Sequence, residues 1–306
     1  MTNFLITGGA GHIGSSLAER LIENENYRVV IIDNLSTGHI DKLPQSASLT
    51  FIKGDVNVYE DLAHVFDQFK FDYVFHFAAV VGVKRTLEHP IGVLEDIDGI
   101  KNILSLSKSS GVKRVFFSSS SEVYGEPFEI PQNENTTPLN SRLPYAIVKN
   151  VGEAFFRSYQ KEYGLPYTIF RFFNTYGPHQ SEDFVVPKFL KAALSGQPLY
   201  IYGDGTQTRS FCYIDDTIET CIKALHDNHE NTILNVGNDR EMTILELANE
   251  ILAISGSTSE IIHLPALEEG DMHRRCPDVT RMKAVLQREL TSLDEGLRKM
   301  IAYYNS

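Results

Sequence analysis

Two side chains that could act together on a proton, Tyr145 and Lys149, lie four residues apart in the segment PYAIVK. That spacing places both on one face of a helix. A phenol with a pKa near ~10 is a poor base at neutral pH, but an adjacent ammonium lowers that pKa and makes the phenolate accessible. Because such pairs are also common on solvated helices, this one predicts proton transfer only if a further hydroxyl lies beside it.

The segment FFSSSSEVYGEP, residues 116–127, supplies hydroxyl groups in a suitable place. A strand-like run ends there in four serines, and the carboxyl ends of strands in a parallel sheet are where ligands bind. The carboxylate of Glu122 follows the serines directly. Glu122 either takes part in the chemistry or forms structural hydrogen bonds with the backbone near the following VYG.

Three glycines, Gly8, Gly11 and Gly14, are spaced as G-x-x-G-x-x-G between a predicted strand and a predicted helix. Such glycines permit a tight turn and a close backbone approach to a pyrophosphate, whose charge the helix N-terminus favours. The next strand ends in Asp33, whose carboxylate could accept from both hydroxyls of an adenosine ribose and would repel a 2′-phosphate. The pattern predicts NAD rather than NADP, and the alternative is a simple turn with a surface aspartate.

Five further residues near this loop are predicted to contact the cofactor. His12 and Ile13 lie inside the glycine pattern, and Asn34 follows the strand-ending aspartate. Asp55 and Val56 belong to the GDV that follows the third predicted strand. A side chain there could reach the adenine, although a plain turn is the alternative.

The elements that must position these residues alternate along the first half of the chain. Predicted strands cover residues 4–6, 29–32, 50–52, 73–77, 115–118 and 167–172. Predicted helices cover residues 14–23, 58–69, 95–109 and 145–163. Strands that alternate with helices indicate a parallel sheet with crossover helices, so the expected fold is α/β with a Rossmann-like, doubly wound parallel sheet.

Beyond Pro178 the alternation breaks up, which predicts a smaller, discontinuous C-terminal lobe for the substrate. Two late segments, SFCYIDDTIETCIKAL and ILNVGN, are expected to return to the main sheet. We therefore expect an NAD-binding Rossmann domain at residues 1–177 plus 211–237. The substrate-binding lobe is expected at residues 178–210 plus 238–306.

Composition narrows the classes of function. The 306-residue chain has a formal net charge of −12, which disfavours nucleic acid and anionic membranes as partners. No apolar run approaches the ~20 residues that span a bilayer, and the start MTNFLITGG reads as a strand rather than a signal peptide. Three cysteines without CxxC spacing and histidines without H-x-x-x-H spacing predict reduced thiols, a cytoplasmic location and no metal site. His76 lies inside a strand and is expected to be a core histidine rather than a base.

At the level of motifs the sequence resembles the extended short-chain dehydrogenase/reductases that act on nucleotide sugars as NAD-dependent epimerases, dehydratases and decarboxylases. The resemblance covers essentially the whole chain and rests on TGGAGHIGSSL, DNLS, GDV, HFAA, SSSSEVYG, PYAIVK, RFFNTYGP, YGDGTQTRSFCYIDD, LNVGN and SLDEGLRKMIAYY. It implies a UDP-sugar substrate and a homodimer formed through the helices at about 95–109 and 145–163. It also implies that NAD lies over Gly8, Gly11, Gly14 and Asp33, with Ala78 nearby.

The resemblance also implies roles for the catalytic residues. Ser120, four residues before the tyrosine of VYG, would hydrogen-bond the sugar O4 while Tyr145 takes the proton of that hydroxyl. Lys149 would hold the nicotinamide ribose and tune Tyr145, and the C4 hydride would pass to NAD to leave a 4-ketosugar. Asn174 and Arg209 resemble the residues that hold the nucleotide diphosphate, for which an amide donor and a guanidinium fork are suited.

The triplet Ser120-Ser121-Glu122 separates the reactions within the family. The 4,6-dehydratases carry Thr-Asp-Glu, so the serine at position 121 removes the acid that dehydration needs. The triplet resembles the Thr-Ser-Glu of UDP-glucuronate decarboxylases, and HRRCPDV resembles their C-terminal arginine segment and points to Arg275. The resemblance therefore favours a UDP-glucuronate decarboxylase that forms UDP-xylose.

Two alternatives stay open. The segments AAVVGVKRTLEHP and LNSRLPYAIVK are more typical of 4-epimerases, and SEDFVV lacks the Asp-Gly-Arg that decarboxylases usually have there, so a UDP-hexose or UDP-hexuronate 4-epimerase is the second candidate. A non-catalytic NAD-sensing protein is a third, against which the intact Ser120, Tyr145 and Lys149 speak.

Overall fold

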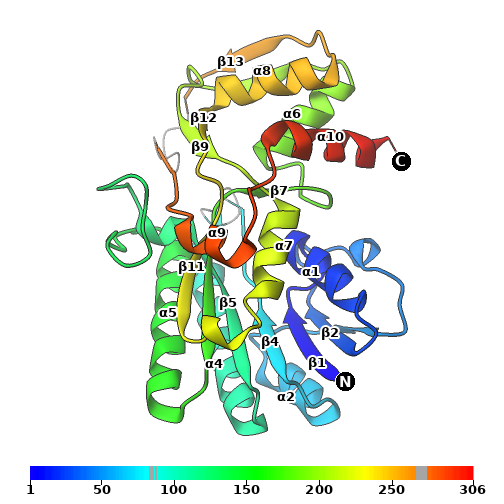
Figure 1. The fold of residues 1–306 in the computed structure, drawn as a ribbon, viewed down its shortest axis with the longest axis vertical. Coiled ribbons are helices and arrows are strands. Elements are labelled where there is room, and N and C mark those ends of the chain that lie inside the picture. The colour runs from blue at the N-terminus through cyan, green and yellow to red at the C-terminus, as the bar shows by residue number, and fades with distance from the viewer. Residues whose placement is uncertain (83–85, 87, 267–273, 306) are drawn as a thin grey trace.

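A seven-stranded parallel sheet forms the centre of the protein (Figure 1). The computed structural model describes residues 1–82, 86, 88–266 and 274–305. The sheet has the strand order β11-β6-β5-β4-β1-β2-β3. Its strands are β1 (Thr2–Thr7), β2 (Tyr27–Asp33), β3 (Leu49–Lys53), β4 (Tyr73–His76), β5 (Arg114–Ser120), β6 (Tyr167–Phe172) and β11 (Thr232–Val236). The predicted doubly wound α/β fold is thus confirmed, with every predicted strand within two or three residues of its bounds.

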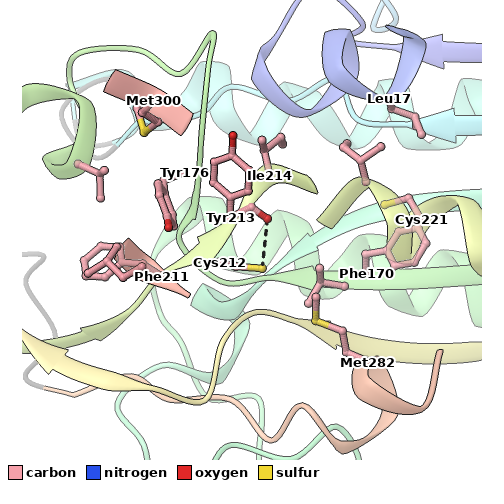
Figure 2. Packing of buried hydrophobic residues seen from close by; sticks show 14 of the residues in the cluster. Leu17, Phe170, Tyr176, Phe211, Cys212, Tyr213, Ile214, Cys221, Met282 and Met300 are labelled. Carbon is pink, nitrogen blue, oxygen red and sulfur yellow. Dashed lines mark hydrogen bonds between the residues drawn. The ribbon is translucent and has the colours of Figure 1, made fainter. Parts of the chain in front are cut away.

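Helices cover both faces of the sheet, as a parallel sheet requires. On one face lie α1 (His12–Ile22) and α7 (Ile214–Lys223), and on the other lie α2 (Tyr59–Gln68), α4 (Pro90–Ser110) and α5 (Pro144–Tyr163). Leu17 of α1 and Cys221 of α7 share one apolar cluster with Phe170 of β6 (Figure 2). A second cluster fills the other face and includes Ile103 of α4 and Phe156 of α5.

The later part of the chain adds short elements at one end of the sheet (Figure 1). These are β7 (Thr175–Tyr176), α6 (Val185–Leu194), β8 (Leu199–Tyr202), β9 (Thr208–Ser210), β10 (Cys212–Tyr213), β12 (Glu241–Thr243), α8 (Ile244–Ser255), β13 (Ile261–Leu264), α9 (Thr280–Leu286) and α10 (Leu293–Tyr304). Short 3-10 turns are η1 (Ile40–Lys42), η2 (Ser121–Tyr124) and η3 (Asp227–His229). Among the described helices, none combines the length and apolar character needed to cross a bilayer.

The expected return of two late segments to the main sheet holds for only one strand. β11 pairs with β6 along five residues and extends the sheet. β10, by contrast, pairs with β7 in a separate two-stranded sheet. β10 is too short to extend the main sheet, because α7 begins directly after it. The apolar side of α7 packs against α1. The division into the two lobes stays a prediction.

The strand order places a switch point at the centre of the sheet. The chain runs outward from β1 through β2 to β3, then crosses to β4 on the other side of β1 and continues outward. In open α/β sheets, ligands bind in the crevice at the carboxyl ends of strands where the order reverses. The loops after β1 and β4 therefore frame the expected site.

Candidate active site

A cavity of about 590 Å³ lies at the carboxyl ends of β1, β4 and β5. Its lining brings together nearly all of the predicted site residues: Gly8, Gly11, His12, Ile13, Gly14, Asp33, Asn34, Asp55, Val56, Ala78, Ser120, Glu122, Tyr145, Lys149, Asn174 and Arg275. Arg209 is the one predicted site residue that does not line it.

The glycine loop is as tight as the sequence pattern predicts. Gly8 has φ +66°, a left-handed conformation that favours glycine, and a Cβ there would lie 2.6 Å from the backbone nitrogen of Ala78. A Cβ on Gly14 would lie 2.5 Å from the carbonyl oxygen of Gly8. No side chain caps the N-terminus of α1, which begins at His12. The first N–H groups of the helix are thus available to a phosphate.

Asp33 ends β2 with both carboxylate oxygens oriented by backbone amides. Oδ2 accepts from the amide of Ala10 at 2.9 Å, and Oδ1 accepts from the amide of Leu35 at 2.8 Å. A carboxylate has further lone pairs, so these bonds fix the group without exhausting its capacity to accept from two ribose hydroxyls. Asn34 donates to Asp55 at 3.0 Å, which ties the loop after β2 to the loop after β3.

His12 is a neutral group at the edge of the same cavity. Burial, together with the charges of Lys42 and His179, lowers its pKa to about 3. Its Nε2 is buried and makes no hydrogen bond to any described residue. A buried polar atom without a partner beside a helix N-terminus fits a site that a phosphate-bearing ligand completes. The loop, Asp33 and His12 together fit a dinucleotide.

Ser120 and Tyr145, for which the resemblance implies catalytic roles, both line the cavity, and their roles stay a prediction. Ser120 is the last residue of β5, and its Oγ accepts from the amide of Glu122 at 3.2 Å. Tyr145, in the first turn of α5, lies close enough for the Ser120 hydroxyl to lower the pKa of the phenol. The helix begins at Pro144, whose fixed φ suits the first helical position. Tyr145 therefore lies at the N-terminal end of α5.

An ammonium together with a positively charged nicotinamide is expected to lower the pKa of Tyr145, but in the protein alone that pKa is raised. Burial is the largest cause and the charges of Glu122 and Asp96 act in the same direction, whereas the Ser120 hydroxyl and the charge of Arg275 lower it. The lysine lies with its Nζ 5.7 Å from the centroid of the tyrosine ring. Desolvation of the phenolate therefore outweighs a cation at this separation.

Lys149 is nearly inaccessible, at 3% exposure, and its pKa is lowered to about 8 by burial while the charge of Asp96 opposes that fall. Its Nζ donates to Ser118 Oγ at 3.3 Å. Ser118, near the end of β5, is thus a polar member of the site. Asp96 also lines the cavity, with 9% of its surface exposed, and was not among the residues predicted from the sequence.

Glu122 and Arg275 form an ion pair inside the cavity, with 2.9 Å between Oε1 and Nη1. Arg275 also donates to Ser121 Oγ at 3.2 Å, so it contacts two members of the serine–glutamate triplet. Arg275 is 6% exposed. The other oxygen, Glu122 Oε2, is buried without a hydrogen bond to a described residue. A carboxylate and a guanidinium therefore stand beside the serine–tyrosine pair.

Two backbone hydrogen bonds fix the segment that carries Arg275. The amide of Gln132 donates to the carbonyl of Cys276, and the amide of Asp278 donates to the carbonyl of Gln132, each at 2.8 Å. Asn235 of β11 donates to the same Gln132 carbonyl at 2.8 Å. The C-terminal arginine is thereby anchored to the loop that follows β5.

Two of the remaining candidates have other surroundings. Asn174 has φ +23° and donates to the carbonyl of Ser210 at 3.0 Å, which leaves it on the cavity wall. Arg209, in β9, donates to the carbonyl of Thr208 at 2.7 Å, outside the cavity lining, so its role at a diphosphate stays a prediction.

His76 is a core histidine as expected: its Nδ1 bonds Thr7 Oγ1 at 2.8 Å, and burial lowers its pKa to about 3.

Comparison with known proteins agrees with this geometry. Residues 4–237 match the NAD dependent epimerase/dehydratase family. The chain is 37% identical to the UDP-N-acetyl-alpha-D-glucosaminuronate decarboxylase of Bacillus cytotoxicus, over 98% of this chain and 97% of that protein. It is 35% identical to UDP-glucuronic acid decarboxylase 1 of Danio rerio, over 98% of this chain and 72% of that protein.

A solved structure of similar fold is the UDP-glucose 4-epimerase of Thermotoga maritima with UDP-glucose, which has a TM-score of 0.93 and 33% identity. The match covers 99% of each chain. The cofactor is NAD, as the glycine loop and Asp33 predict. The glycine loop and the group formed by Ser120, Tyr145 and Lys149 agree with these matches. The chain belongs to the NAD-dependent epimerase/dehydratase family and is an enzyme of the epimerase and decarboxylase type.

Proposed function

We propose that the protein is a UDP-hexuronate decarboxylase that works through a transient 4-keto intermediate, with UDP-glucuronate as the first candidate substrate and UDP-xylose as its product. The observation that carries this proposal is the ion pair of Glu122 with Arg275 beside Ser121, in the cavity that holds Tyr145. A plain inversion at C4 needs no such pair. Decarboxylation does need a cation, because the substrate carries a carboxylate at C6.

The first half-reaction oxidises C4: a hydride leaves C4, and a proton leaves the oxygen of the C4 hydroxyl. NAD, held at the glycine loop and Asp33, would supply reversible acceptance of the C4 hydride. Tyr145 takes the proton of the C4 hydroxyl while Ser120 holds that oxygen. Lys149 keeps a positive charge close to the developing phenolate, and the charge of a bound nicotinamide would further offset the raised pKa of Tyr145.

The resulting β-keto acid loses CO2 because its ketone accepts the electrons of the C5–C6 bond. An enolate forms across C5 and C4, C5 then takes a proton, and C4 regains hydride while O4 regains a proton. An arginine offers five N–H donors in a fork, so Arg275 can serve both Glu122 and the substrate carboxylate. In this proposal Glu122, which pairs with that guanidinium, orients it and relays a proton to C5, directly or through water.

The relatives support the reaction type without deciding the sugar. Their names give two hexuronates, one with an N-acetyl group, so both UDP-glucuronate and UDP-N-acetylglucosaminuronate belong in the assay. The test incubates purified protein with NAD and each substrate and follows CO2 release and the product by NMR. CO2 with a UDP-pentose supports the proposal, whereas a C4 epimer of the hexuronate, such as UDP-galacturonate, formed without CO2 rejects it.

A 4-epimerase is the second candidate, and the observation that favours it is the close structural similarity to a UDP-glucose 4-epimerase. For that reaction Ser120, Tyr145 and Lys149 would suffice. Inclusion of UDP-glucose and UDP-galactose in the same panel distinguishes the two. A non-catalytic sensor is disfavoured by the assembled hydroxyl–phenol–ammonium group.

We also propose a homodimer formed through α4 and α5, and a cytoplasmic location. The two helices pack side by side, and they leave the apolar side chains Ile91, Leu94 and Ile147 exposed at 73%, 41% and 41%. Exposed apolar side chains on neighbouring helices are typical of an interface with a second copy. The free thiols Cys212, Cys221 and Cys276 suit a reducing compartment.

A further inference from the structure

The ammonium of Lys149 is buried with few partners of its own. The hydrogen bond to Ser118 Oγ, at 3.3 Å, is long and goes to a neutral group. The faces of two aromatic rings lie near Nζ, with centroids at 5.1 Å for Phe117 and 5.7 Å for Tyr145. Burial of an ammonium is costly unless an opposite charge compensates it. The charge of this lysine therefore needs a carboxylate in reach.

Asp96 is the carboxylate that meets this need. It lies on α4, faces the same cavity and is 9% exposed. Its charge opposes the burial that lowers the pKa of Lys149, and the charge of Lys149 in turn opposes the burial that raises the pKa of Asp96. The two groups thus stabilise each other's charged forms across the cavity wall.

Other titratable groups face this pair without replacing it. His76 of β4 is neutral, because burial and the charge of Lys149 both lower its pKa. Asp55, from the loop after β3, raises the pKa of Asp96 by repulsion. Glu122 acts on Tyr145 but is engaged by Arg275.

The fold holds Asp96 in place through a non-local contact. The side-chain amide of Asn57 accepts from the backbone N–H of Gly99 at 3.0 Å and donates to Asp96 Oδ1 at 3.5 Å. A Cβ on Gly99 would lie 2.7 Å from Asn57 Oδ1, so glycine permits this approach of α4 to the loop. The second oxygen, Asp96 Oδ2, accepts from the amide of Val80 at 2.8 Å. Asp96 therefore also ties the loop after β4 to α4.

We propose that Asp96 is a positioning residue of the reaction, which keeps Lys149 in its ammonium form and holds the loop after β4 against the cofactor cavity. The inference rests on the proposed roles of Tyr145 and Lys149. Removal of the charge should lower the pKa of the lysine, so that a larger fraction is neutral near pH 8. Removal of the whole side chain should in addition release Val80 and weaken NAD binding.

Asp96→Asn tests the charge, because asparagine can still accept from Val80. The matched control is Asp98→Asn, two residues along the same helix, where the carboxylate is exposed and paired with Lys101 at 2.8 Å. Each NAD-loaded protein, labelled with 13C-lysine, is titrated by NMR, and the Lys149 signal is assigned by its loss in Lys149→Met. We expect the pKa of Lys149 to fall by about one unit in Asp96→Asn and to stay unchanged in Asp98→Asn.

Equal lysine pKa values in Asp96→Asn and Asp98→Asn would overturn the proposal. Circular dichroism and NAD content check folding. If Asp96→Asn does not fold, Asn57→Ala keeps the carboxylate and its bond to Val80 but removes the contact at Oδ1. It should shift the same signal downward by less, and no shift there overturns the proposal as well. The titration needs no substrate, so its outcome is independent of whether any UDP-hexuronate is turned over. With a substrate in hand, the alkaline limb of kcat/KM should move to lower pH in Asp96→Asn alone.

Discussion

The carboxylate of Glu122 and the guanidinium of Arg275 form an ion pair with 2.9 Å between Oε1 and Nη1, although one residue follows β5 and the other precedes α9. The pair stands beside the serine–tyrosine group and has no role in hydride transfer itself. In the proposed decarboxylation, the pair would hold the substrate carboxylate from which CO2 leaves.

Arg275→Ala should separate oxidation from decarboxylation. CO2 release from UDP-glucuronate should fall roughly 100-fold, since loss of one charged group that stabilises a transition state commonly costs this much. Oxidation at C4 should persist, detected as absorbance of reduced cofactor at 340 nm. The control is Arg274→Ala, because the adjacent arginine is exposed and pairs with Glu241 instead. A variant at position 275 that releases CO2 at the wild-type rate would contradict the assigned role.

Tyr145→Phe should abolish turnover and keep the cofactor. Loss of a general base costs about 10²–10⁴-fold in kcat. The cofactor should stay bound, because the phenol lies beside Ser120 and is not part of the glycine loop. Tyr159→Phe, on the same helix, should behave as wild type. Bound NAD is measured after denaturation. Full activity of Tyr145→Phe would instead support the sensing hypothesis.

The activity of the wild-type enzyme should fall as the pH rises through about 8. Lys149 is charged below its pKa of about 8 and neutral above it, so its support of the phenolate is present at lower pH and lost at higher pH. The measurement is kcat/KM for UDP-glucuronate from pH 6 to pH 10, at constant ionic strength. A profile that stays flat or rises to pH 10 would show that the charge of this lysine is not required.

Gly14→Ala should eliminate NAD from the purified protein. The added methyl group would lie 2.5 Å from the Gly8 carbonyl and 2.7 Å from Gly9 Cα, so the loop must open. We expect the Kd for NAD to rise by roughly 100-fold or more, which corresponds to about 3 kcal/mol. Calorimetric titration measures it, with Ser16→Ala on the same helix as control. Wild-type affinity in Gly14→Ala would show that the loop tolerates a side chain.

Ile147→Glu should convert the proposed dimer to a monomer, because it places a charge on an exposed apolar face of α5. Light scattering at micromolar concentration measures the mass. Val58→Glu, at an exposed apolar side chain before α2, is the matched control. A wild-type protein that is already monomeric would reject the dimer.

The sequence predicted those parts of the site that depend on local patterns. Glycine spacing, a strand-ending aspartate and a Tyr-x-x-x-Lys pair each describe a geometry that a few neighbouring residues determine, and all of them line the cavity. The central sheet was predictable for the same reason, since runs buried on both faces are uniformly apolar.

The rest depended on contacts between distant segments. Asp96 lies in LEDIDG, where the sequence gives no reason to prefer it over its acidic neighbours. It is set apart by the approach of α4 to Asn57, which places one carboxylate inside the cavity and leaves Asp98 in solvent. The raised pKa of Tyr145 likewise reflects burial that only the assembled fold produces.

The anchoring of Arg275 through Gln132 has a consequence for synthesis on the ribosome. The NAD cradle and the serine–tyrosine–lysine group are complete in the first half of the chain, whereas the arginine enters only with the segment that follows β13. A nascent chain that ends at residue 237 holds the whole span matched to the family, yet it lacks the cation assigned to the substrate carboxylate. The growing polypeptide thus acquires the residues predicted to bind its cofactor before it acquires the arginine assigned to the proposed release of CO2.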